Sequence, residues 1–184
     1  MVTVTHLDRE ATNYVEPLCD LLADAVHSGA SIGFLAPLAR DTARDYWRQV
    51  LACLGEGLRL WVAQSEGRVV GSIQLVPSLK QNGRHRAEIQ KLFVLTTHRG
   101  QGISSRLMVA AEQHALDIGC SLLVLDTLAG ADAEAVYRHL GWQRAGEIPC
   151  YAATPDGRLH GTVYYFKLVG PEHARIPASD ASAL

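Results

Sequence analysis

Apolar and polar residues alternate along this 184-residue chain with two different periods. Apolar residues at every second position predict strands, whereas apolar residues three and four positions apart predict helices. On this basis we expect both kinds of element, mixed along the chain as in an α/β domain. The strands are predicted over residues 2–7, 58–64, 68–76, 87–95, 121–127, 143–149 and 161–168, and the helices over 10–28, 40–54, 102–118 and 131–140.

Residues 87–127 are predicted to form a strand, a short glycine-containing loop, a helix and a second strand. The second strand, SLLVLDT, is almost continuously apolar, which is typical of a strand covered on both faces. A strand–helix–strand unit of this kind forms a parallel pair with a right-handed crossover. Because antiparallel hairpins are predicted before and after it, we expect an α/β fold with a mixed sheet.

The length and composition favour one ordinary globular domain, which we expect over residues 1–169, followed by a flexible tail over 170–184. A formal charge of −2 gives no electrostatic reason to expect nucleic acid or an anionic membrane as partner. No signal peptide or long apolar segment is visible, so a cytoplasmic location is expected. The eight histidines show no metal-ligand spacing, and we expect no metal site.

The loop RGQGISS, which leads into the third predicted helix, favours an anionic ligand. A helix N-terminus offers unpaired N–H groups and the positive end of the helix dipole. Gly100 and Gly102 leave those donors accessible, Arg99 adds positive charge, and Ser104 and Ser105 add hydroxyl groups. The loop therefore predicts a phosphate site, with a tight connection that binds no ligand as the alternative. No Gly-Lys-Ser/Thr follows, which excludes a Walker A loop, and the dinucleotide pattern lacks its third glycine.

RGQGIS resembles the Arg/Gln-x-x-Gly-x-Gly/Ala motif of GNAT-family N-acetyltransferases, with Ser104 in place of the last small residue. AEAVYRHLGW (133–142) is similar to the family's second motif, although Gly130 stands where many members have Asn. The resemblance implies the GNAT fold, in which a parallel strand pair splays around acetyl-CoA between helices on both faces, in a monomer or homodimer. The residues it implies for acetyl-CoA binding are Leu92, Phe93, Val94, Arg99, Gly100, Gln101, Gly102, Ile103, Ser104, Ser105, Ala133 and Tyr137.

Acetyl transfer to an amine needs a base, a donor to the carbonyl oxygen and an acid for the leaving thiolate. Glu88, within an otherwise apolar strand, and Asp126, at the carboxyl end of another, are the candidate bases. The alternatives are a solvated or ion-paired side chain for Glu88 and a helix cap for Asp126. Tyr137 is the candidate acid, or else a packed aromatic residue, and the backbone N–H of Val94 is the candidate donor to the carbonyl oxygen.

Three further stretches, GASIGF (29–34), NGRHRAEIQKLFVL (82–95) and YAATPDGRLHGTVYYFK (151–167), are similar to those of a GNAT member that acetylates the amino group of a β-lactam toxin. We therefore expect a small-molecule amine as acceptor, and toxin or antibiotic resistance as the narrower hypothesis. A catalytically inactive acyl-CoA sensor and a protein or peptide acetyltransferase remain as alternatives. The expected acceptor-binding residues are Ser31, Phe34, Glu88, Asp126 and Tyr151.

Overall fold

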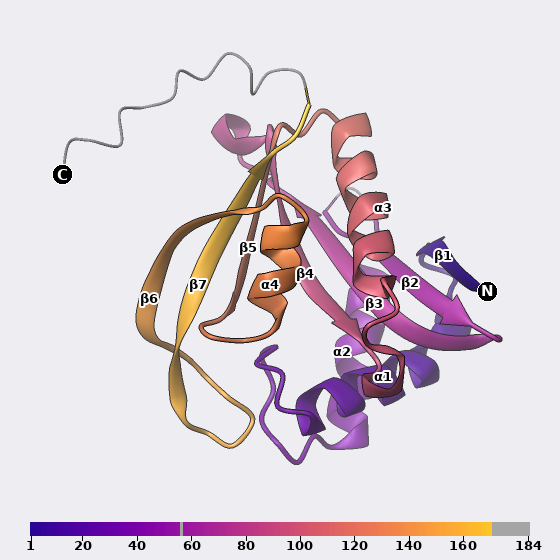
Figure 1. Cartoon of the computed structure of the whole chain (residues 1–184). Helices are drawn as coiled ribbons and strands as arrows, with labels where there is room; N and C mark the ends of the chain where they lie inside the picture. Colours follow the sequence, from indigo (N-terminus) through magenta and orange to yellow (C-terminus); the bar gives the residue numbers. More distant parts are fainter. Residues whose placement is uncertain (56, 171–184) are drawn as a thin grey trace.

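The computed structural model describes residues 1–55 and 57–170, which form one mixed sheet flanked by helices (Figure 1). Seven strands lie in the order β1-β2-β3-β4-β5-β7-β6, and only the β4–β5 pair is parallel. The fold is therefore the α/β fold with a parallel pair that the sequence predicts. The strands are β1 Val2–Leu7, β2 Arg59–Ser65, β3 Arg68–Pro77, β4 Arg86–Val94, β5 Leu122–Leu128, β6 Gln143–Ala153 and β7 Leu159–Leu168. The helices are α1 Val15–His27, α2 Arg40–Ala52, α3 Ile103–Asp117 and α4 Ala133–His139.

Two boundaries differ from the sequence prediction by four residues or more, each for a local reason. The first helix was predicted from residue 10 but begins at Val15, after a short 3₁₀ turn. Proline has no N–H and is tolerated only in the first turn of a helix, so Pro17 requires a late start. Strand β6 continues to Ala153, beyond the predicted end at 149. Its pairing with β7 is irregular around Pro149, and this irregularity hides the alternation on which the prediction relied. Apart from its first residue, the predicted tail lies outside the described residues.

Helices cover both faces of the sheet. Gly71 of β3 faces α3, because a Cβ built there would lie 3.0 Å from Leu107 Cδ1. Gln74 points to the opposite face, where its Nε2 donates a hydrogen bond of 3.0 Å to the Tyr46 hydroxyl of α2. Helix α1 packs beside α2 and against β3, whereas α3 lies along the other face of strands β1 to β4 (Figure 1). The sheet therefore has an α1/α2 face and an α3 face.

The parallel strands β4 and β5 separate soon after they begin to pair. They are paired only from Arg86 to Glu88 on β4, while β4 continues to Val94. Between Gln90 and Phe93 the strand contains one more residue than β3 opposite, and Lys91 has a positive φ of 52°. An extra residue of this kind is a β-bulge, which bends and twists its strand. The two strands therefore diverge toward the loop that precedes α3.

Candidate active site

Glu88 and Asp126 project from the same face of the sheet, at the point where β4 and β5 separate. Glu88 is paired with Val124 of β5, and Asp126 lies two residues after Val124. Paired residues, and residues two apart on one strand, point to the same side of a sheet. Glu88 is also paired with Val76 of β3, which has the same orientation as Gln74. Both candidate bases therefore face the α1/α2 side of the sheet.

The environment of Asp126 suits a proton acceptor. Burial by the surrounding atoms raises the pKa of Asp126, the negative charge of Glu88 raises it further, and the positive charge of Lys91 opposes both effects. Gln90 Nε2 donates a hydrogen bond of 2.8 Å to Glu88 Oε1 and so fixes the orientation of that carboxylate. Because a base works best when its pKa lies near the working pH, the shift at Asp126 favours proton transfer.

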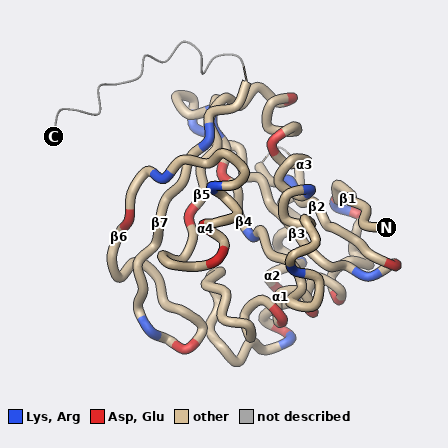
Figure 2. The backbone as a smooth tube through the Cα atoms, viewed as in Figure 1, with Lys and Arg blue, Asp and Glu red and all other residues tan. Residues whose placement is uncertain are grey.

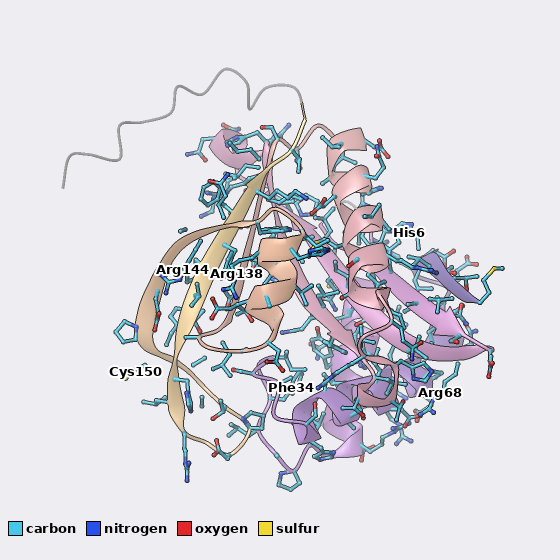
Figure 3. The ribbon with its side chains drawn as sticks, viewed as in Figure 1. His6, Phe34, Arg68, Arg138, Arg144 and Cys150 are labelled. Atoms are coloured by element: carbon cyan, nitrogen blue, oxygen red, sulfur yellow. The ribbon has the colours of Figure 1, made fainter. Side chains whose placement is uncertain are left out.

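The expected acceptor-binding residues gather around the same face. Ser31 Oγ, in the loop between α1 and α2, donates to the carbonyl oxygen of Ala153 at 3.2 Å. Phe34 of the same loop, labelled in Figure 3, packs edge-on against Tyr46, with the ring centroids 5.2 Å apart. The α1–α2 loop therefore extends from the helix pair to the end of β6.

Tyr151 is joined to this group through a residue that the sequence analysis did not select. Tyr164 of β7 is paired with Asp126 and so shares its face, and its hydroxyl donates to that of Tyr151 at 2.7 Å. This hydrogen bond, followed by burial, raises the pKa of Tyr164 to about 12. The alternation in β7 was visible in the sequence, but the register that places Tyr164 opposite Asp126 was not.

Tyr137 of α4 approaches the diverging strands from the other face. Its ring packs against Trp142 and Tyr165, with centroids 6.3 and 5.9 Å away. Tyr165 is paired with Leu125, the neighbour of Asp126, and therefore points away from the α1/α2 side. Burial, and then the charge of Asp126, raise the pKa of Tyr137, so its hydroxyl keeps its proton at neutral pH. Within the described residues that hydroxyl has no hydrogen-bond partner.

The glycine loop presents free donors to open space. Gly102 is the N-cap of α3 with φ +71°, and Gly100 has φ +75°. A Cβ built on either would have no atom within 4 Å, and the N–H groups of Gly100, Gln101 and Gly102 have no partner in the part of the chain that the structure describes. Ser104 and Ser105 lie half-buried in the first turn of α3. These residues fit a pyrophosphate such as that of acetyl-CoA.

The backbone of β4 supplies the other donors expected for the cofactor. The N–H of Leu95 donates to Val70 of β3, so by alternation the N–H groups of Leu92 and Val94 point to the opposite edge, where β5 has diverged. The same alternation turns the N–H of Phe93 toward β3, and its side chain is buried.

The remaining residues expected to bind the cofactor differ in how much of their side chain is accessible and in which direction it points. Ile103 is buried in the core, which leaves only its backbone for a ligand. Arg99 donates to Ser28 Oγ at 2.8 Å, so its guanidinium lies at the end of α1 rather than over the glycines. Gln101 is exposed, and Ala133 is half-buried at the start of α4.

Outside this group of residues, the described chain also contains a cavity that could hold a ligand. A cavity of about 470 Å³ lies near the β1 edge of the sheet, where His6, Arg9 and Arg59 are among its lining residues, and none of the candidate residues borders it. Acidic and basic residues are interspersed along the chain in Figure 2. No helix among the described residues is both long and apolar enough to cross a membrane.

Comparison with known proteins identifies related sequences. The model of the GNAT acetyltransferase family matches residues 23–142. An uncharacterized N-acetyltransferase of Azospirillum brasilense is 37% identical over 127 residues, which cover 68% of this chain and 74% of that protein. N-acetyltransferase 8 of Rattus norvegicus is 35% identical over 105 residues, or 56% of this chain, and the match spans only 46% of that longer relative.

Solved structures share the fold at lower identity. The ribosomal-protein-alanine N-acetyltransferase of Brucella melitensis superimposes with a TM-score of 0.74 at 21% identity, over 91% of this chain and 99% of that one. A candidate acetyltransferase of Salmonella typhimurium, solved with its cofactor acetyl-CoA, gives 0.75 at 17% identity over 98% and 99% of the two chains. At these identities the likeness establishes the fold and leaves the acceptor open.

Proposed function

Because this chain belongs to the GNAT acetyltransferase family, whose cofactor is acetyl-CoA, we propose that it transfers an acetyl group directly to the amine of a small molecule. The observation that carries the proposal is the position of Glu88 and Asp126. Both face the same side of the sheet, beside the opening between β4 and β5 and within the strand–loop–helix unit that ends in the free N–H groups of Gly100 to Gly102.

In this proposal, backbone N–H groups of two segments bind different parts of acetyl-CoA. Acetyl-CoA supplies the thioester that is attacked. The N–H groups at the start of α3 would hold its pyrophosphate, and the outward N–H group of Leu92 would donate to its pantetheine arm. The outward N–H of Val94 would stabilise the carbonyl oxygen as that atom gains charge.

Proton transfer is assigned to the three side chains at the opening. An alkylammonium has a pKa near ~10 and must lose a proton before it attacks. Glu88 or Asp126 accepts that proton, directly or through water. Tyr137, whose raised pKa keeps it protonated, donates a proton to the departing thiolate, and the second proton, which the acetylated nitrogen loses, returns to the phenolate directly or through water. No covalent enzyme intermediate is required, because the amine attacks the thioester carbon itself.

The acceptor is, in our proposal, an amino-acid-like amine or a β-lactam toxin or antibiotic. The support is the resemblance of residues 29–34, 82–95 and 151–167 to the tabtoxin resistance protein. The side chains of Ser31, Phe34 and Tyr151, which these stretches contribute, all lie on the α1/α2 side. An acidic site also attracts a cationic amine.

Thiol release from acetyl-CoA tests the proposal. The purified protein is assayed against free amino acids, polyamines, aminoglycosides and peptides with free N-termini, and we expect amine-dependent thiol release with free amino acids or other small amines. Acetyl-CoA binding without turnover on any acceptor would instead support a sensor module. Turnover confined to peptides or proteins would support a protein acetyltransferase, the activity named for the Brucella melitensis neighbour.

A further inference from the structure

Lys91 occupies an unusual backbone position. It is the extra residue of the β4 bulge, and its φ of +52° is uncommon for a residue other than glycine. Such a conformation costs free energy and is retained where the surrounding structure holds it, often at a functional site. The bulge brings Lys91 out of the regular alternation of β4, three residues after Glu88.

The side chain of Lys91 extends to the loop expected to line the acceptor. Its Nζ donates a hydrogen bond of 2.7 Å to the carbonyl oxygen of Ile32. The next residue, Gly33, lies so close that a Cβ built on it would be 3.6 Å from the same Nζ. The ammonium group is therefore held beside the α1–α2 loop, on the face that carries Glu88 and Asp126.

The ammonium of Lys91 retains unused hydrogen-bonding capacity. An ammonium group has three donors, and within the described residues only one has a partner, the Ile32 carbonyl. Asp126 and Glu88 lie close enough to affect the pKa of Lys91, yet neither forms an ion pair with it within 4.0 Å. Burial lowers the pKa of Lys91, which indicates that water solvates it incompletely. A partly buried charge with unused donors gains from an anionic partner.

We propose that Lys91 binds the carboxylate of the acceptor, and that the acceptor is therefore an amino acid or a compound with a carboxylate close to the reacting amine. A zwitterion matches this face, because its ammonium is directed to Glu88 and Asp126 while its carboxylate meets Lys91. This inference rests on the proposed function and narrows its acceptor class. It also assigns Lys91 a substrate-binding role that the hydrophobic pattern of the sequence does not indicate.

Paired acceptors test the role of the carboxylate. The L-amino acids and the corresponding L-amino acid amides are compared as acceptors for the wild type, for Lys91→Met, and for Lys80→Met as a control at an exposed lysine. We expect kcat/KM for the acids to fall about 10- to 100-fold in Lys91→Met, mainly through KM, and kcat/KM for the amides to change little. An equal loss for acids and amides would mean that Lys91 only positions the loop, and would overturn the proposal.

A binding measurement separates this inference from the proposed reaction. Calorimetric titration of the CoA-bound protein with N-acetyl-L-amino acids and their amides requires no turnover. Tighter binding of the acids to the wild type, lost in Lys91→Met but kept in Lys80→Met, would support carboxylate recognition even if no amine were acetylated. Equal binding of acids and amides by the wild type would overturn it, whatever the outcome of the thiol assay.

Discussion

At the residue scale, the feature that suits Asp126 for catalysis also costs stability. Its pKa is raised because burial and the charge of Glu88 disfavour the ionised form in the folded protein. The unfolded chain ionises near the ordinary value of 3.8, so the folded state binds the proton more tightly. Folding therefore becomes less favourable as the pH rises from 3.8 through the folded-state pKa, and above that pKa the whole penalty is present.

Asp126→Asn is accordingly predicted to lose activity while it gains or keeps stability. The amide removes the penalty of the ionised carboxylate, so the melting temperature at pH 7 should equal or exceed that of the wild type, and the difference should shrink as the pH falls toward 3.8. Thermal unfolding across pH checks this, with Asp132→Asn as the control, because Asp132 is exposed and its carboxylate has no hydrogen-bond or ion-pair partner among the described residues. A marked decrease in melting temperature at pH 7 would contradict it.

Glu88→Gln is predicted to lower turnover by about 100-fold or more, the usual contribution of a general base. Acetyl-CoA affinity should be retained, because Glu88 faces the acceptor side. Steady-state kinetics and calorimetry measure the two effects separately. Near-normal turnover in Glu88→Gln, combined with a large loss in Asp126→Asn, would assign proton abstraction to Asp126 alone.

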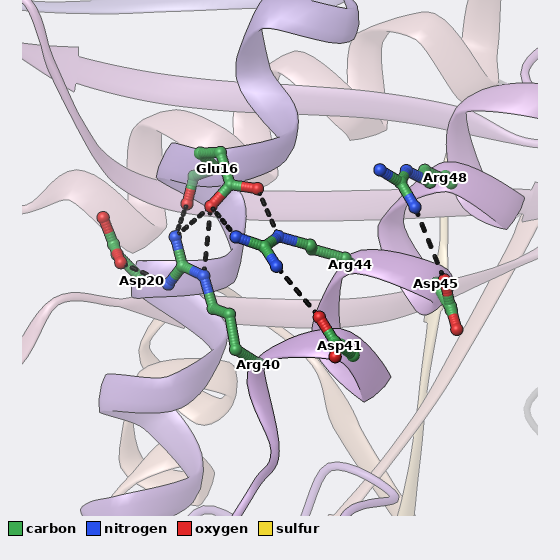
Figure 4. A network of polar contacts seen from close by, with 7 residues as sticks. All are labelled: Glu16, Asp20, Arg40, Asp41, Arg44, Asp45 and Arg48. Atoms are coloured by element: carbon green, nitrogen blue, oxygen red, sulfur yellow. Dashed lines mark hydrogen bonds and ion pairs between the residues drawn. The ribbon is translucent and has the colours of Figure 1, made fainter.

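At the element scale, charged side chains connect α1 to α2 on the surface (Figure 4). Glu16 of α1 accepts hydrogen bonds from Arg40 and Arg44 of α2, the latter at 2.6 Å. The hydrogen bond from Arg44, then that from Arg40, lower the pKa of Glu16 to about 2 from an ordinary value of 4.5. The cluster links α1 to α2, the two helices between which the α1–α2 loop extends. Water and salt weaken ion pairs that are this exposed.

Glu16→Gln should lower the melting temperature at pH 7 by a few degrees at most. Because the folded-state pKa of Glu16 is depressed, the contribution of its carboxylate to folding stability is present above pH 4.5. That contribution is lost as the pH falls toward 2. The difference between wild type and Glu16→Gln should therefore narrow over that interval, and also in high salt. Glu10→Gln, which removes an exposed carboxylate that forms no ion pair within the described chain, is the control. A difference independent of pH would argue against the ion-pair mechanism.

The sequence predicted the elements well and their junctions less well. Among the described residues periodicity located every strand and α-helix, because burial on one face imposes a regular pattern, whereas it gave no sign of the short 3₁₀ turns. It missed the bulge at Lys91, because the continuous apolar run of residues 92–95 that follows shows no alternation from which a shift of one residue could be recognised. It also missed the hydrogen bond of 2.7 Å that the Gly130 N–H donates to the buried Glu134 carboxylate, which holds the turn at the position where Asn is common in the family.

The sequence was enough to select the residues of the candidate site by their chemistry, but it did not predict how they are arranged in space. Acyl-transfer chemistry selected Glu88 and Asp126, but their common face follows from the pairing of β4 with β5, which the sequence does not reveal. Lys91 and Tyr164 become visible only with the bulge and with the register of β7. The proposed roles of all these side chains remain predictions.

At the scale of the whole molecule, the proposed site joins both faces of the sheet. Glu88 and Asp126 approach the diverging strands from the α1/α2 side, Tyr137 approaches from the α3 side, and the glycine loop closes the end. A single ligand lying between β4 and β5 would contact both layers at once. Acetyl-CoA is therefore expected to stabilise the entire fold, because it binds the folded state and has no site in the unfolded chain.

This linkage gives a test of the glycine loop that needs no acceptor. At an acetyl-CoA concentration about 100 times its Kd, folding should gain about 2.7 kcal/mol, which corresponds to a rise in melting temperature of about 5–10 °C. In Gly102→Trp the indole would fill the space needed by the pyrophosphate, and the rise should disappear. Gly119, at the other end of α3, also has a positive φ and open space around it, so Gly119→Trp imposes a similar backbone strain without touching the loop. If both variants lower the melting temperature of the free protein and only Gly102→Trp loses the response to acetyl-CoA, the effect belongs to the ligand site. An undiminished response in Gly102→Trp would place the pyrophosphate elsewhere.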